Sequence, residues 1–102
     1  MKVYDKLVRD RIPEIIENSG NHCEVEIVSN EIALEYLYKK LQEEVDELVS
    51  DKNLEEIADV MEVLFGIANE LGYSEEDLLN KRNDKLQERG GFKEGVVLIN
   101  VN

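Results

Sequence analysis

Two pairs of carboxylates stand close together near the middle of the chain. Glu44 and Glu47 are three residues apart, and Glu56 and Asp59 repeat that spacing. Residues three apart share one face of a helix. Residues 50–53 between the pairs have the composition of a turn, so two helices joined there would fold back antiparallel and bring both pairs together. Because four convergent carboxylates repel one another, and because hard oxygen ligands suit Mg²⁺ or Mn²⁺, the spacing predicts a divalent-metal site.

The apolar pattern around these acids supports that interpretation. A helix expected over residues 54–71 is almost wholly apolar from Ile57 to Ala68, where only Asp59, Glu62 and Gly66 interrupt it. A helix that is apolar on most sides is buried. Carboxylates on its inner sides then need a charge partner or a metal, because burying an uncompensated charge is costly.

Three simpler interpretations stay open for these residues. Acid pairs at this spacing also occur in ordinary solvated helices. Glu56 has the position to close a capping box with Asn53. Glu43, the extra member of the EE pair, has the position to orient a ligand, to activate water without contacting the metal, or to face solvent.

A second group of residues offers cations and an amide to phosphate. Arginine binds phosphate bidentately and lysine acts as a point charge. The group also fits a plainer role, as surface charge that balances an acidic protein. Its members are Lys6, Arg9, Asn83, Lys85 and Arg89.

The net charge of −12 is concentrated in one part of the chain. Residues 31–79 hold fifteen acids and three bases, whereas residues 1–11 and 81–89 each carry a net charge of +2. An acidic centre between basic edges argues against binding to a nucleic-acid polymer and fits a small anionic ligand. A solvated acidic surface that keeps the protein soluble is the alternative for the bulk of the charge.

Length and composition predict one soluble domain over residues 1–102. The chain is long enough for a small core only, which oligomerisation would supplement. The single cysteine, Cys23, excludes an internal disulfide and a cysteine-based zinc site within one chain. This cysteine usage predicts a reduced, cytoplasmic compartment. We expect a soluble protein, because the start has no apolar signal region and no run approaches about 20 apolar residues.

The periodicity predicts an all-α fold with a small β-ribbon. We expect helices over about 13–18, from a cap at Ser29 or Asn30 to the turn at residues 50–53, over about 54–71, and over about 75–88. Residues 23–28 and 95–101 have strand-like composition and would pair as the ribbon. An isolated pair would be marginal unless it packs on the helices or on another subunit.

The motifs resemble those of a known superfamily. EEVDE followed by EIAD is similar to the EExxE…ExxD signature of the all-α nucleoside triphosphate pyrophosphohydrolases, the MazG-like superfamily. Asn83, Lys85, Leu86 and Arg89 match the N-x-K-[FL]-x-x-R pattern of some members. The segments YDKLVRDRIPEII and RGGFKEGVVL resemble a small single-domain branch labelled phosphoribosyl-ATP pyrophosphohydrolase-like, so the resemblance extends from Tyr4 to Leu98.

The resemblance implies an enzyme with a helical core, assembled as a homodimer or homotetramer. Such enzymes cleave a nucleoside triphosphate between its α and β phosphates, giving a monophosphate and pyrophosphate. By resemblance, the metal would be held by Glu44, Glu47, Glu56 and Asp59, a carboxylate among Glu43, Glu44 and Glu47 would activate water, and Lys6, Arg9, Asn83, Lys85 and Arg89 would bind the substrate. Two alternatives stay open: phosphoribosyl-ATP hydrolysis in histidine synthesis, and a non-catalytic acidic helical protein that binds a partner.

Overall fold

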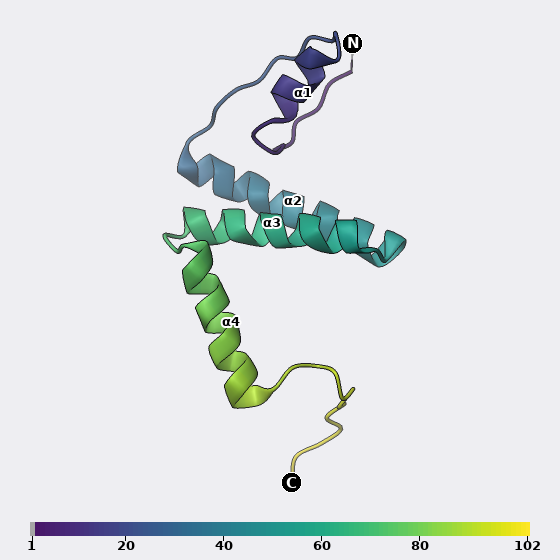
Figure 1. Ribbon diagram of the computed structural model, residues 1–102, viewed down its shortest axis with the longest axis vertical. Coiled ribbons are helices and arrows are strands. Elements are labelled where there is room, and N and C mark those ends of the chain that lie inside the picture. Colours follow the sequence, from purple (N-terminus) through teal and green to yellow (C-terminus); the bar gives the residue numbers. More distant parts are fainter. Residues whose placement is uncertain (1) are drawn as a thin grey trace.

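A helical hairpin forms the centre of the computed structural model, which describes residues 2–102. Helices α2 (Asn30–Asp51) and α3 (Leu54–Glu70) lie antiparallel against each other (Figure 1). Helix α1 (Ile12–Asn18) lies on the α2 side of the hairpin, and α4 (Glu75–Arg89) leaves the end of α3 on the opposite side. The predicted all-α class is confirmed for the described residues.

The turn between α2 and α3 is shorter than its composition suggested. Helix α2 runs on to Asp51, and Lys52 ends it in the left-handed conformation, with φ of 53°. Asn53 then caps α3 by accepting a hydrogen bond of 2.9 Å from the Glu56 amide. Two residues therefore reverse the chain, which places the last turns of α2 directly beside the first turns of α3.

A close approach between the two helices explains the glycine in the apolar run of α3. A Cβ atom added to Gly66 would stand 3.0 Å from a methyl carbon of Leu37 on α2. Among residues 2–102, Leu37 is one of three buried apolar side chains, together with Val63 and Ala68 of α3. The interface between α2 and α3 is thus the core of the chain.

This core is small for the size of the chain. The radius of gyration is 17.7 Å, whereas a compact domain of this length has about 13 Å. The accessible surface is 9265 Å², against about 5,900 Å² for a typical folded monomer of this mass. The chain therefore leaves apolar surface uncovered that most single domains bury.

The predicted β-ribbon is wrong for the single chain. Residues 23–28 and 95–101 are extended but belong to no strand. One segment connects α1 to α2, and the other follows α4 at the opposite end of the molecule (Figure 1). Strand-like composition indicated the faces of each segment but not its neighbour, and α4 carries the second segment away from the first.

The remaining boundaries agree with the sequence to within two residues. Helix α1 begins at Ile12, α3 ends at Glu70, and α4 continues to Arg89. Ser74 begins α4 with a capping box, in which its hydroxyl accepts from the Asp77 amide. No helix within residues 2–102 combines the length and apolar composition needed to cross a bilayer.

Candidate metal centre

The two acid pairs meet at the end of the hairpin that carries the two-residue turn. Glu44, Glu56 and Asp59 offer carboxylate oxygens that all lie within 4.8 Å of one another. Glu43, Glu44 and Glu47 form a second group by the same measure. Glu44 belongs to both groups, so the late turns of α2 and the early turns of α3 supply one continuous set of carboxylates. We call these five residues the acid cluster.

Two oxygens of the acid cluster are buried without a hydrogen-bond partner. They are Oε2 of Glu44 and Oε2 of Glu56. Glu44 is only 6% exposed, and it is the one buried charged residue among residues 2–102. Most buried polar side-chain atoms have a partner, so two unpaired carboxylate oxygens on facing helices need a specific explanation. A cation between them supplies one.

The electrostatics of these two residues agree with that explanation. Burial raises the pKa of Glu44, and the nearby Lys40 only partly opposes this effect. The pKa of Glu56 is also raised, first by burial and then by repulsion from Glu47, Asp51 and Asp59. Both carboxylates thus hold a proton more readily than an ordinary glutamate does, and a metal ion would compete with that proton.

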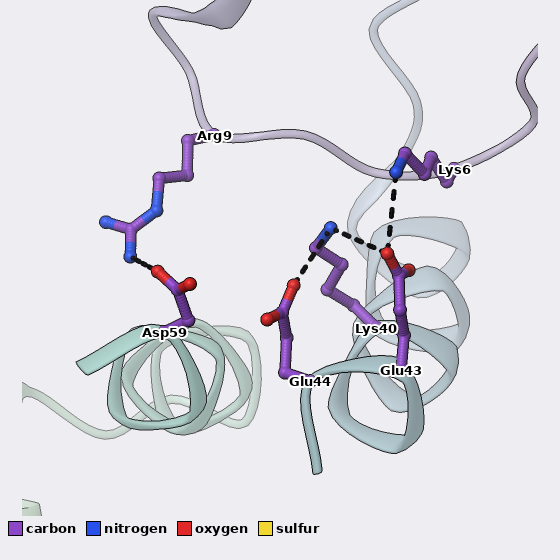
Figure 2. A network of polar contacts seen from close by, with 6 residues as sticks. All are labelled: Lys6, Arg9, Lys40, Glu43, Glu44 and Asp59. Carbon is purple, nitrogen blue, oxygen red and sulfur yellow. Dashed lines mark hydrogen bonds and ion pairs between the residues drawn. The ribbon is translucent and has the colours of Figure 1, made fainter. Parts of the chain in front are cut away.

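Three cationic side chains already contact the acid cluster, as Figure 2 shows. Arg9 donates to Oδ1 of Asp59 at 2.7 Å, and the Lys6 ammonium lies 3.4 Å from Oε1 of Glu43. Lys40 bridges Glu43 and Glu44 at 3.6 and 3.2 Å. On Glu44 the lysine takes Oε1, so the buried Oε2 still lacks a partner.

The N-terminal arm, residues 2–11, reaches the cluster because it is tied to α2. The Tyr36 hydroxyl donates to Asp5 at 2.6 Å, which fixes the arm one residue before Lys6. Arg9 then extends to α3, while Lys6 extends to α2 (Figure 2). The arm therefore crosses both helices of the hairpin above the carboxylates.

The remaining candidate residues lie elsewhere. Asn83, Lys85 and Arg89 are all exposed on α4, which begins at the far end of α3 and runs away from the hairpin (Figure 1). The Asn83 side chain accepts a hydrogen bond from its neighbour Arg82. One chain alone therefore does not bring the amide and cations of α4 to its own acid cluster.

Two of the simpler interpretations can be compared with this geometry. Asn53 caps α3 as the capping-box interpretation required, but one carboxylate oxygen of Glu56 is buried and unpartnered within the acid cluster. Glu43 is partly exposed and paired with Lys6 and Lys40, so it does not simply face solvent.

Lys40 is a site residue that the sequence reasoning missed. A local signal was available, because Lys40 precedes Glu43 and Glu44 by three and four residues, the spacing of helical ion pairs. The Asp5–Tyr36 bond has no such signal, since 31 residues separate its partners.

Comparison with models of protein families, with curated proteins and with solved structures gave no match. The candidate centre therefore depends on its own geometry. Its donor set consists entirely of carboxylate oxygens, which fits a hard divalent cation.

Proposed function

We propose that the chain is a Mg²⁺-dependent nucleoside triphosphate pyrophosphohydrolase of the MazG-like type. One observation carries the proposal: unpartnered buried oxygens of Glu44 and Glu56 lie with Asp59 at the meeting point of two helices. The motif resemblance supplies the reaction, which is cleavage between the α and β phosphates. Mn²⁺ is an alternative ion for the same ligands.

Each residue of the site receives a role from its position. Glu44, Glu47, Glu56 and Asp59 would hold the ion, which when bound would offset phosphate charge and polarise the reacting centre. Glu43, Glu44 or Glu47 would orient or deprotonate the attacking water. Lys6 and Arg9 would turn from the carboxylates to the phosphates of an arriving substrate, since each sits on an exposed, exchangeable ion pair.

The proposal includes a homodimer or homotetramer, because one chain leaves both its core and its site incomplete. Ile57, Met61 and Leu64 of α3 form a stripe at helical spacing and are 42–51% exposed. A second copy packed on that stripe would bury it. Such a copy is also a source for Asn83, Lys85 and Arg89, which no single chain directs at its own carboxylates.

Pyrophosphate release from a panel of nucleoside triphosphates, with phosphoribosyl-ATP as one member, tests the proposal. We expect Mg²⁺-dependent release of a monophosphate and pyrophosphate, loss of activity with EDTA, and a decrease of at least about 100-fold in Asp59→Asn. The matched control is Glu62→Gln, which removes an exposed acid of the same helix outside the cluster.

Three results would count against the enzyme. They are activity that survives EDTA, activity that survives Asp59→Asn, and the absence of any Mg²⁺-dependent rise in melting temperature. The last result, together with an acid cluster that tolerates alanine, would favour the non-catalytic binding protein instead.

A further inference from the structure

The C-terminal tail, residues 95–101, is an apolar segment that nothing in its own chain covers. Val96, Val97, Leu98, Ile99 and Val101 are each 76–84% exposed. The tail is extended, and within residues 2–102 no backbone hydrogen bond joins residues 96–101 to another segment. Because successive side chains of an extended segment point to opposite sides, VVLI is apolar on both faces. A strand of that kind is normally covered on both faces.

A second extended segment has the complementary properties. Residues 23–28 connect α1 to α2 without backbone pairing, and Val25 and Ile27 are exposed. Glu24 and Glu26 alternate with these apolar residues, so two copies of this segment paired with each other would oppose like charges. The tail carries no charge between Gly95 and Val101. Residues 23–28 would therefore pair with the tail more favourably than with residues 23–28 of a second copy.

The two segments are kept apart within one chain. The molecule extends 60 Å along its longest axis, and Figure 1 places the connection before α2 and the segment after α4 on opposite sides of the hairpin. Helix α4 is an uninterrupted helix of 15 residues that holds this separation. Pairing therefore requires two molecules.

We propose that the tail of one copy adds as a β-strand to residues 23–28 of a second copy. Reciprocal exchange would give a closed two-fold assembly in which both tails are covered. The accessible surface leaves room for such an interface: the excess over a compact monomer is about 3,300 Å² per chain, and stable interfaces bury about 1,200–2,000 Å² in total. The inference concerns assembly and does not depend on the proposed reaction.

Cys23 provides a direct test, because it is the only cysteine and lies at the start of the receiving segment. One protein is the unaltered chain. Its partner carries Cys23→Ser and a single tail cysteine, introduced in turn by substitution at each of positions 96–101. After the two proteins are mixed, allowed to exchange subunits and mildly oxidised, any disulfide between the two must join different molecules.

We expect covalent heterodimers whose yield alternates with a period of two along the tail, because alternate positions of a strand face the same side. The matched control is Val3→Cys in the Cys23→Ser background, an exposed apolar position outside both segments. Tail positions should exceed this control at least about fivefold at the favoured register. A chain ending at Glu94 should keep its helical circular dichroism, and its self-association should weaken at least about tenfold.

Several results would overturn the exchange. Yields no higher than those of the Val3→Cys control would show that the tail does not pair with residues 23–28. Homodimers that form from the tail-cysteine chain alone in preference to heterodimers would indicate pairing between tails. An internal disulfide in Ile99→Cys with Cys23 retained, at the mass of one chain, would restore the ribbon within a single molecule.

Discussion

The two ends of the α2–α3 hairpin differ in what the chain supplies to them. At the end with the two-residue turn, five carboxylates, Lys40 and the N-terminal arm are all brought together by one chain. At the other end α4 leaves the hairpin with its cations exposed, and the apolar tail follows it into solvent. The difference indicates that a single chain assembles a candidate metal centre but not the surroundings that would complete it.

Local hydrogen bonding and short sequence spacing explain why one chain brings the acid cluster together at the end with the two-residue turn. Glu44 and Asp59 are separated by two helical segments and one short turn, and Asn53 fixes the start of the second segment. At the second end, the cations of α4 and the apolar residues of the tail are exposed. Helix α4 contacts the end of α3 but extends away from the hairpin. Within residues 2–102, residues 96–101 of the tail that follows it form no backbone hydrogen bond with another segment.

The largest expected effect is that of Glu56→Gln, which tests the acid cluster at the end of the hairpin with the two-residue turn. We expect activity to fall at least about 100-fold, because the ion would lose one of its ligands. The metal-free protein should melt at a higher temperature, because the substitution removes a carboxylate that burial and three neighbouring acids destabilise in its charged form. Pyrophosphate release and thermal melting with and without Mg²⁺ measure both effects.

Glu55→Gln is the matched control for that pair of measurements. Glu55 is the preceding residue on α3 but is exposed and outside the acid cluster. The Glu55→Gln substitution should leave activity and the Mg²⁺-dependent change in melting temperature unaltered. Equal behaviour of the two variants would contradict the metal centre.

The next effect tests whether α4 of one copy supplies its cations to the acid cluster of another copy. We expect Asp59→Asn and the double variant Lys85→Ala/Arg89→Ala each to lose most of the activity. A mixture of the two should recover about a quarter of wild-type activity, because half of a random set of dimers would be mixed and each mixed dimer would hold one intact site. Steady-state rates after subunit exchange measure the recovery.

Lys81→Ala/Arg82→Ala serves as the control, since it removes two other exposed cations from the same helix. This variant should retain activity before mixing. A mixture of the two impaired proteins that stays inactive would mean that α4 of one copy does not serve the acid cluster of another.

The same comparison shows which parts of the fold and of the candidate site could be predicted from the sequence. The acid cluster was predictable because its four motif acids lie within sixteen residues and follow helical spacing, and the caps Ser29 and Asn53 mark the two helices that carry them. The position of the N-terminal arm was not predictable, because 50 residues separate Arg9 from Asp59. The ribbon prediction failed for a related reason: alternation in residues 23–28 describes a strand's faces and carries no information on which segment pairs with it.

A smaller effect distinguishes Arg9 from Arg11, the two arginines at the end of the N-terminal arm. Arg9→Ala should lower kcat/KM about tenfold, because a bidentate phosphate donor is lost. The Mg²⁺ affinity should not weaken and should rise, because Arg9 no longer competes for Asp59. Stability should change by less than about 1 kcal/mol, since the ion pair is largely exposed.

Arg11→Ala is the comparison for Arg9→Ala. Within the part of the chain that the structure describes, Arg11 forms an ion pair with Glu14 alone, at 3.2 Å, and with no member of the acid cluster. Its kcat/KM and Mg²⁺ affinity should match those of the unaltered protein. Indistinguishable values for the two variants would remove Arg9 from the site.

The smallest effect is a dependence of metal binding on pH. The raised pKa values of Glu44 and Glu56 mean that the free fold retains protons that the unfolded chain releases. The stability from those protons is fully present below the ordinary glutamate pKa of about 4.3 and is lost as the pH rises through the raised values. A bound ion would replace the protons, so the increase in melting temperature with saturating Mg²⁺ should be larger at neutral pH than at a pH near that ordinary value. Thermal melting across this range measures how the Mg²⁺-dependent increase in melting temperature changes with pH. This pH dependence should be unaltered in Glu62→Gln and mostly lost in Glu56→Gln. An increase that is independent of pH in the unaltered protein would show that no proton is displaced, and therefore that the ion does not bind at Glu44 and Glu56.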